Sequence, residues 1–313
     1  MKKIVRPIIA VTMLLGLVSQ QVYAIDTTAI NEKWGKPTVV YGGGLNDQQI
    51  KETSQLLGIK DENTVTTTKA TGEDLVKYLG AGEANTSVMI SSVMVQKRNK
   101  GEGVKVHIAT PKNITLVTSE QYANAAITAG IADAEIEVAA VSKVTGESAL
   151  TGVYKAFEAN GVVLDGKRTA VAQQELELTN QIAQEQSKEK GFDAAKLDQA
   201  MIDIKKSLAE IKEKQGQVAT KEDVERIVNE ALKKYGLDKV ISPTQVNNII
   251  QFALSYQQTS AIDSKQVLEQ LNSLSNTVKG KIGQLVDQAN REGWFDKIVT
   301  FFKEIFNAIF QSK

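Results

Sequence analysis

Acid–base chemistry in this chain would depend on one histidine and a row of carboxylates. His107 is the only histidine and the sequence contains no cysteine. A thiolate nucleophile is therefore excluded, and a histidine-rich zinc site is disfavoured. His107 alternates with Val106 and Ile108, so we expect its ring on the polar, solvent-facing side of a strand. No Gly-x-Ser-x-Gly motif accompanies it, and we predict that His107→Ala lowers stability by no more than about 0.5 kcal/mol.

The carboxylates that could act in pairs are Asp133, Glu135 and Glu137. Glu135 and Glu137 fall on one face of an expected strand, opposite Ile136 and Val138. Paired carboxylates can perform general acid–base catalysis, but this alternation is also typical of a solvated strand face. We favour the solvated face and predict no catalytic residue, no cofactor and no metal ligand in the chain.

A glycine run at 42–44 follows a short expected strand and precedes a helix. Backbone amides at such a junction can cradle an anion, because the first turn of a helix carries partial positive charge. The run matches neither the Walker A pattern nor Gly-x-Gly-x-x-Gly. A tight turn is therefore the favoured interpretation.

These residues lie in a first half that alternates strands with short helices. Asn46 with Gln49 and Thr118 with Gln121 are capping-box pairs, and glycines close most of the helices. The strands expected at 88–97 and 103–110 are joined by five residues, which indicates a hairpin. The remaining strands are expected at 38–41, 63–68, 114–117 and 134–141, and the helices at 46–57, 73–79, 118–130 and 147–159.

A sequence echo supports parallel strand pairing in this half. Leu-Gly-Ile at 57–59 and Ala-Gly-Ile at 129–131 each end a helix and lead into a strand. Each is preceded by a strand, a cap and the helix, which indicates two βαβ units with right-handed crossovers. We therefore predict an α/β layer domain made of βαβ units plus a hairpin.

The second half is predicted to be entirely helical. One apolar stripe is formed by residues that recur at spacings of three and four: Leu197, Met201, Ile204, Leu208 and Ile211. Such stripes need partners, so an all-α domain with bundle or coiled-coil packing follows. The helices are expected at 169–187, 194–214, 221–235, 243–256 and 264–290.

Residues 1–24 have the pattern of a secretory signal peptide. Lys2, Lys3 and Arg6 precede an apolar run that is too short to span a bilayer, and Val22-Tyr23-Ala24 offers small residues for cleavage. Cleavage after Ala24 would leave 34 basic against 37 acidic residues, a net charge of −3. That balance disfavours nucleic acid as a partner and suits a secreted or cell-envelope protein outside the cytoplasmic membrane.

The C-terminal segment 293–313 is predicted to be an aromatic amphipathic helix. It contains five of the eight phenylalanines and one of the two tryptophans, and its charges are too many for a spanning helix. Three roles stay open: docking on the chain's own helical domain, lying in a membrane interface, or filling a partner protein's groove. The predicted membrane- or partner-binding residues are Trp294, Phe295, Ile298, Phe301, Phe302, Ile305, Phe306, Ile309 and Phe310.

Several stretches resemble the YpuA-like family of exported Firmicutes proteins, a domain of unknown function (1002). The resemblance rests on residues 122–134, on Thr-Gly-Glu-Ser-Ala-Leu-Thr-Gly at 145–152, on Val-Tyr-Gly at 40–42 and on the helix end at 57–59. It implies an extracellular or envelope location and supplies no catalytic residues.

The sequence as a whole therefore predicts a signal peptide (1–24), an α/β domain (25–165), a helical domain (166–292) and the C-terminal helix (293–313). The favoured function is non-enzymatic binding or scaffolding at the cell envelope. The alternative is a carboxylate-dependent hydrolase that acts on envelope polymer, which would need acidic side chains converging in a concave site. The oligomeric state is not predicted.

Overall fold

The computed structural model describes residue 25 and residues 34–80 and 83–289. Its first half contains five strands and four α-helices, whose bounds follow. The strands are β1 Thr38–Gly42, β2 Thr66–Ala70, β3 Ser92–Lys97, β4 Val104–Ile108 and β5 Ala134–Ala139. The helices are α1 Asp47–Leu56, α2 Gly72–Leu79, α3 Ser119–Ala129 and α4 Ser148–Ala159.

The five strands form one mixed sheet in the order β2-β1-β3-β5-β4. β1 pairs in parallel with β2 across α1, and β4 pairs in parallel with β5 across α3. Two βαβ units are therefore present, as predicted, but the second begins with β4 and not with the strand expected at 114–117. β3 joins the two units because it is antiparallel to β1 on one side and to β5 on the other.

The predicted hairpin is wrong. β3 and β4 are consecutive in the chain, but β5 lies between them and pairs with both. Ile136 and Val138 on one side of β5 and Glu137 on the other are all buried, which is typical of a strand in the interior of a sheet.

Three other predicted strands differ from the structure. Residues 86–88 form a turn of 3-10 helix, so β3 begins at Ser92 and not at residue 88. Residues 62–64 form a turn of 3-10 helix, so β2 begins only at Thr66. Residues 114–117 are not a strand, and Ile114 makes a single isolated bridge to Val144.

The sequence echo corresponds to one repeated helix ending. Gly58 and Gly130 have φ values of 73° and 100°, a left-handed conformation that glycine adopts without strain. The next amide reaches back five residues in each case, from Ile59 to the Ser54 carbonyl and from Ile131 to the Ala126 carbonyl, both at 2.9 Å. Each glycine thereby closes its helix with a Schellman-type motif and directs the chain into the sheet.

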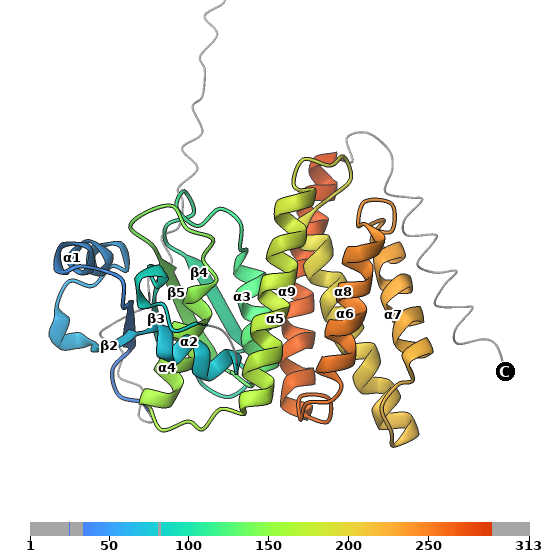
Figure 1. Ribbon diagram of the computed structural model, residues 1–313, viewed down its shortest axis with the longest axis horizontal. Helices are drawn as coiled ribbons and strands as arrows, with labels where there is room; N and C mark the ends of the chain where they lie inside the picture. Colours follow the sequence, from blue (N-terminus) through green and yellow to red (C-terminus); the bar gives the residue numbers. More distant parts are fainter. Residues whose placement is uncertain (1–24, 26–33, 81–82, 290–313) are drawn as a thin grey trace, which may run out of the picture.

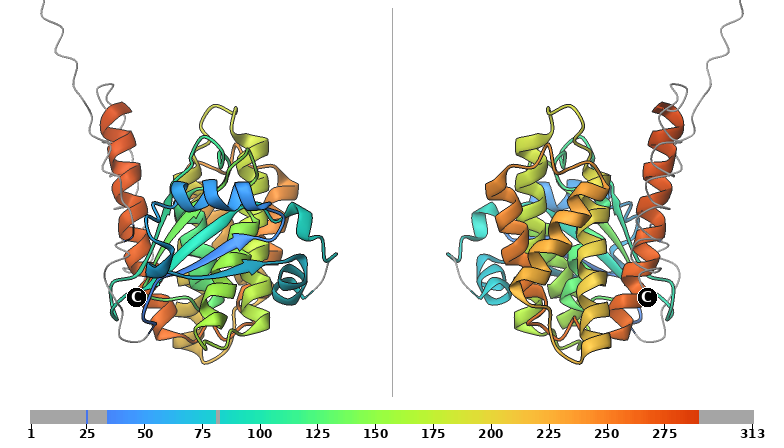
Figure 2. Two further views of the ribbon diagram at one scale, coloured as in Figure 1. Left: turned by 90° about the vertical axis from the view of Figure 1, so that its left-hand side faces the viewer. Right: turned by 90° about the vertical axis from the view of Figure 1, so that its right-hand side faces the viewer.

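The central strands β1, β3 and β5 are largely buried, whereas the edge strands β2 and β4 are partly exposed. The left view of Figure 2 shows α1 in front of the sheet and helices behind it. Val40, Val93 and Ile136 point to the side covered by α3 and α4 and belong to the main core. Val39 and Met94 point to the side of α1 and belong to a smaller cluster. That smaller cluster, called the outer core below, consists of Ile25, Val39, Tyr41, Leu45, Leu57, Ile59, Val65, Met94 and Ala139.

Within residues 166–289 the structure has the five helices that the sequence predicted there. Asp165 caps the first of them by accepting from the amides of Lys167 and Arg168, and Ser242 and Gln245 form the predicted capping box of another. The helices are α5 Gly166–Gln186, α6 Ala194–Gln215, α7 Lys221–Lys234, α8 Pro243–Tyr256 and α9 Lys265–Ala289. Figure 1 shows them as layers stacked beyond α3 on the side of the sheet away from α1.

The main core continues from the sheet into these helices. Val93 of β3, Ile127 of α3, Leu176 of α5 and Ile204 of α6 belong to one buried cluster. The change from α/β to helical structure near residue 165 is thus not a gap in the packing. Separate folding of 25–165 and 166–292 stays a prediction, and the shared core disfavours it.

Candidate functional site

Glu137 is the carboxylate that the structure singles out. It lies on β5 with Met94 of β3 and His107 of β4 as its cross-strand neighbours, on the sheet face that carries the outer core. Its exposed fraction is 3%, so the predicted solvated strand face is wrong at this position. Glu137 is buried because Ile25, which is distant in the sequence, packs over this part of the sheet and is itself 4% exposed.

His107 lies beside this carboxylate. Its Nδ1 is 3.2 Å from Oε1 of Glu137, and its side chain is 41% exposed, as expected for the polar side of β4. Partial burial lowers the pKa of His107 below its ordinary 6.5, so the ring is neutral at pH 7. A neutral ring can hydrogen-bond to Glu137 but does not balance its charge.

Burial raises the pKa of Glu137 from 4.5 to about 7, and a hydrogen bond from the Ile25 backbone N–H partly opposes that shift. A folded-state pKa above the unfolded value means that the native state holds the proton more tightly. The ionised carboxylate therefore costs stability as the pH rises from about 4.5 to about 7. A carboxyl that titrates near neutrality is the kind of group that acid–base catalysis uses, but structural burial produces the same shift.

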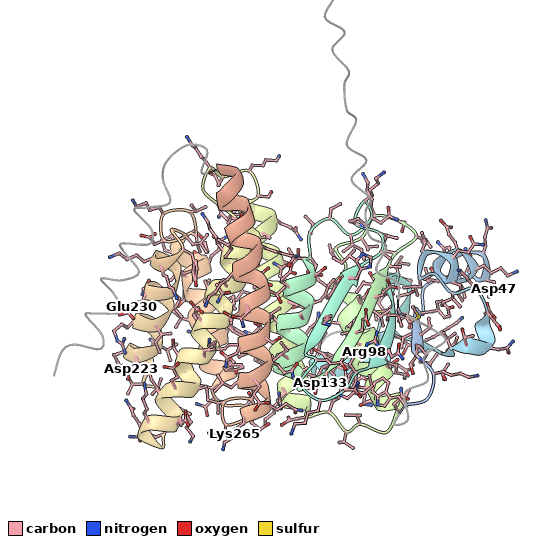
Figure 3. The ribbon with its side chains drawn as sticks, turned by 180° about the vertical axis from the view of Figure 1, so that it is seen from behind. Asp47, Arg98, Asp133, Asp223, Glu230 and Lys265 are labelled. Atoms are coloured by element: carbon pink, nitrogen blue, oxygen red, sulfur yellow. The ribbon has the colours of Figure 1, made fainter. Side chains whose placement is uncertain are left out.

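The other two carboxylates of the predicted row have structural partners. Glu135 is ion-paired with the guanidinium of Arg98, whose backbone N–H donates to the Asp133 carbonyl at 2.7 Å. The Asp133 side chain accepts from the amides of Gly101 and Gly103, both at 3.0 Å. Figure 3 shows Arg98 and Asp133 together at one end of the sheet. These contacts close the β3–β4 connection and give the hydrolase alternative no support.

The glycine run at 42–44 is a tight turn, as favoured. The Gly43 amide donates to the Ala70 carbonyl at 2.8 Å and the Gly44 amide to the Met89 carbonyl at 3.0 Å. Both amides are thus occupied by the protein itself. An anion cradle would need them directed outward.

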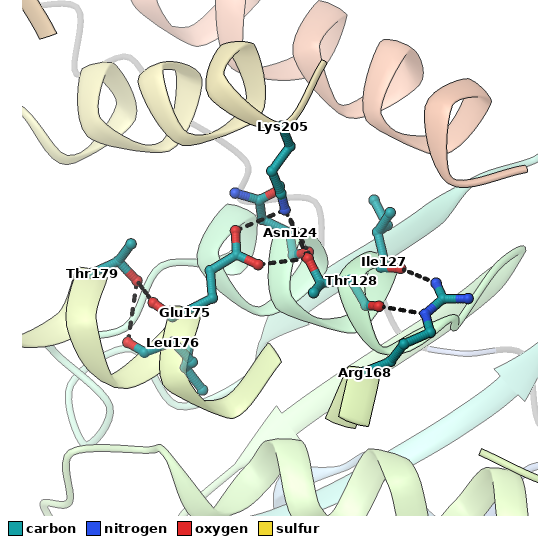
Figure 4. A network of polar contacts seen from close by, with 8 residues as sticks. All are labelled: Asn124, Ile127, Thr128, Arg168, Glu175, Leu176, Thr179 and Lys205. Atoms are coloured by element: carbon teal, nitrogen blue, oxygen red, sulfur yellow. Dashed lines mark hydrogen bonds and ion pairs between the residues drawn. The ribbon is translucent and has the colours of Figure 1, made fainter. Parts of the chain in front are cut away.

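A second polar cluster lies inside the main core, where α3, α5 and α6 meet (Figure 4). The Lys205 ammonium is fully buried and lies 2.7 Å from Oε1 of Glu175, 2.6 Å from Oδ1 of Asn124 and 2.9 Å from Oγ1 of Thr128. Thr128 in turn donates to the second carboxylate oxygen of Glu175 at 2.6 Å. The ring of Tyr256 lies 5.7 Å from the ammonium.

This cluster is closed to solvent. The side chains of Lys205 and Glu175 are 0% and 2% exposed, and burial lowers the pKa of Lys205 although Glu175 opposes the shift. The buried ion pair links α5 to α6, and the hydrogen bonds of Lys205 to Asn124 and Thr128 link both helices to α3. We assign the cluster a structural role.

The sequence-based predictions did not single out Lys205, although the spacing of α6 carries a signal for it. It lies four residues after Met201 and three before Leu208, on the apolar stripe of α6 rather than on the polar side. A charge on such a stripe either reaches solvent along its alkyl stem or meets a buried counter-charge. Glu175 of α5 is that counter-charge.

The predicted membrane- or partner-binding residues, from Trp294 to Phe310, lie outside the described residues. In the ranges that the structure does describe, no group of three or more His, Asp or Glu side chains is placed to hold a metal ion. None of the described helices has the length and apolar character needed to cross a bilayer.

Comparison with known proteins places this architecture in a family. The model of the family described as "Protein of unknown function (DUF1002)" matches residues 41–274. The chain belongs to this family. A relative described as "Uncharacterized protein YpuA", from Bacillus subtilis (strain 168), is 30% identical over 315 residues, which cover 99% of this chain and 98% of the relative. No solved structure matches.

The family resemblance read from the residues is thus confirmed. The DUF1002 match includes both polar clusters, the pair of Glu137 and His107 and the network around Lys205, but neither Ile25 nor the segment 293–313. Similarity to YpuA covers 99% of the chain and so reaches beyond the DUF1002 match. Neither description names an activity, so a function must be argued from the chemistry of the chain.

Because the ring is hydrogen-bonded to Glu137, the expected loss of unfolding free energy for His107→Ala in this DUF1002 protein rises from about 0.5 kcal/mol, the sequence-based limit, to about 1 kcal/mol or less. The ring is half-exposed and neutral, and it offers Glu137 one hydrogen bond. Urea denaturation at pH 7 measures the change. Lys105→Ala is the matched control, because Lys105 is exposed on the same face of β4, and its effect should be near zero. A loss above about 2 kcal/mol for His107→Ala would show that more than one hydrogen bond depends on the ring.

Proposed function

We propose that this chain is an exported, non-enzymatic binding protein that attaches to a membrane surface through residues 293–313. The secretory pattern of residues 1–24 supports export. The family adds no activity that would argue for catalysis. The proposal rests mainly on a mismatch between the C-terminal segment and the described body of the protein.

The C-terminal segment is more apolar than docking on a single neighbour requires. At 100° per residue, its ten large apolar side chains from Trp294 to Phe310 span about half of a helix circumference. Asp296, Lys297 and Asn307 fall on the opposite half. Full burial of each large apolar side chain contributes roughly 1.5–3 kcal/mol. Such a segment therefore requires a broad apolar environment.

The described body offers little exposed apolar surface for that purpose. Its exposed large hydrophobic side chains are Val88 and Val163, and neither belongs to α5–α9. The apolar stripes of these helices are already used in the main core, as for Leu208 of α6 and Val278 of α9. A lipid interface supplies the missing environment, because it accepts an apolar face while leaving the polar half in water.

Charge contributes little to this attachment. The side chains of residues 293–313 include three lysines and two carboxylates, so they nearly balance. A helix attached mainly through apolar burial should bind neutral and anionic membranes alike, whereas a polybasic segment would require anionic lipid. We therefore expect similar binding to phosphatidylcholine and to phosphatidylglycerol vesicles.

Deletion of residues 293–313 should abolish sedimentation of the chain from residue 25 onward with both kinds of vesicle. The body should keep its helicity by circular dichroism, because a membrane-bound segment does not pack on the helical domain. Phe302→Asp, in the centre of the apolar half, should weaken binding at least tenfold. Asn307→Asp adds the same charge on the polar half and is the matched control.

Two results would count against the attachment. Loss of helicity on deletion, with sedimentation unchanged, would mean that the segment docks on its own helical domain. Absence of sedimentation by the undeleted chain, with helicity kept on deletion, would leave a partner protein's groove as the role of the segment.

A further inference from the structure

The backbone nitrogen of Ile25 lies in a buried polar contact. Ile25 is 4% exposed within the outer core, among Val39, Tyr41 and Met94. Its backbone N–H donates to the carboxylate of Glu137. The outer core thus holds the side chain of Ile25, and the sheet holds its nitrogen.

This nitrogen is the atom that signal-peptide removal would change. The small residues that end at Ala24 predict cleavage of the Ala24–Ile25 bond. Hydrolysis of that bond gives the carboxylate of Ala24 to the released peptide and leaves an amine on Ile25, which is protonated at neutral pH. The neutral donor that faces Glu137 would become a cation without any movement of the chain.

Neither contact described for the Glu137 carboxylate carries a positive charge while Ile25 is joined to Ala24. These contacts are the neutral amide of Ile25 and the neutral ring of His107. The guanidinium of Arg98 is paired with Glu135, one step along the same face of β5. A buried carboxylate without a balancing charge is costly, and an ammonium group at hydrogen-bonding distance removes most of that cost.

We propose that cleavage after Ala24 turns the Ile25 amide into an α-ammonium group that forms a buried ion pair with Glu137, so that only the processed chain completes the outer core. This inference rests on the cleavage included in the proposed function and is independent of membrane attachment. The processed chain is thereby more stable than the precursor, whose segment 1–24 is still attached. Stability is gained after export, once the chain no longer has to be unfolded.

A thermal double-mutant cycle tests the ion pair. The chain that begins at Ile25, released from a fusion cleaved directly before this residue, is compared with the same chain acetylated at its α-amine, each with and without Glu137→Gln. Acetylation should lower Tm by about 5–10 °C when Glu137 is present, since one partner of a buried ion pair is lost. It should lower Tm by less than about 2 °C in Glu137→Gln. Glu135→Gln is the matched control, and there the full effect of acetylation should remain.

Reactivity of the α-amine gives a readout that does not depend on stability. In the folded chain, 2-pyridinecarboxaldehyde should label the Ile25 amine at least tenfold more slowly than the amine of a chain extended by Gly-Ser before Ile25. Equal Tm losses on acetylation with and without Glu137→Gln, or equal labelling rates, would overturn the ion pair. N-terminal sequencing of exported protein tests the cleavage separately, and a start at any residue other than Ile25 would overturn the dependence on processing.

Discussion

Lys205→Met should lower the free energy of unfolding by about 3–5 kcal/mol, the usual cost of removing one partner of a buried ion pair. The ammonium is fully buried and makes its shortest contacts, at 2.6 and 2.7 Å, to Asn124 and Glu175. Methionine fills similar space but leaves the carboxylate of Glu175 in the core without its cation. The hydroxyl of Thr128 still donates to that carboxylate, but one neutral donor does not replace the ammonium.

Urea denaturation followed by circular dichroism measures this loss. Lys214→Met is the matched control on the same helix, because Lys214 is 69% exposed and lies 3.8 Å from Glu210 in a surface pair. That change should stay within about 0.5 kcal/mol. Adding Glu175→Gln to Lys205→Met removes the unpaired charge and should recover more than half of the lost stability.

The location of this ion pair also bears on cooperativity. Lys205 belongs to α6, Glu175 to α5 and Thr128 to α3, which is the crossover helix of a βαβ unit. Separating the sheet and α3 from the later helices would leave the Lys205–Glu175 pair without the hydrogen bonds of Asn124 and Thr128. A loss below about 1 kcal/mol for Lys205→Met, or a recovery that fails in the double variant, would contradict this account.

The secondary structure of the chain followed from its sequence wherever local signals determine it. Thr118 with Gln121 and Ser242 with Gln245 form capping boxes in the structure, and Gly130 ends its helix in a left-handed conformation. Parallel pairing within each βαβ unit also follows locally, because the crossover helix leaves few alternatives. These features depend on residues only a few positions apart, or on one strand–helix–strand segment.

The predictions that the structure contradicts concern contacts between segments that are distant in the sequence. The six residues between β3 and β4 are compatible with a hairpin, and nothing in their sequence shows that β5 is inserted between the two strands. The alternation at Glu135 and Glu137 is that of a solvated strand, and it does not show that Ile25 packs beside Glu137, which is 3% exposed, while the side chain of Glu135 stays 21% exposed. Lys205 is a different case from the hairpin and Glu137, because its position on the apolar stripe of α6 was visible in the sequence.

A contact with a segment distant in the sequence also explains why position 42 is a glycine. Gly42 ends β1 and its amide donates to Oγ of Ser92 at 3.0 Å. A Cβ built on Gly42 would lie 2.2 Å from the carbonyl oxygen of Met89 and 2.9 Å from the carbonyl carbon of Ile90. These are backbone atoms of the segment that leads into β3, so rotation of a side chain cannot relieve the clash.

Gly42→Ala should therefore lower the free energy of unfolding by about 3 kcal/mol or more, at the upper end of the cost of overpacking. Thermal unfolding followed by circular dichroism is the measurement. Gly280→Ala is the matched control, because Gly280 is exposed within α9 and a Cβ there meets nothing within 4 Å. In a helix interior alanine is favoured over glycine by roughly 0.5–1 kcal/mol, so this control should gain stability. A neutral Gly42→Ala would mean that the segment at Met89 and Ile90 can move away from β1, and that the tight turn does not fix the sheet.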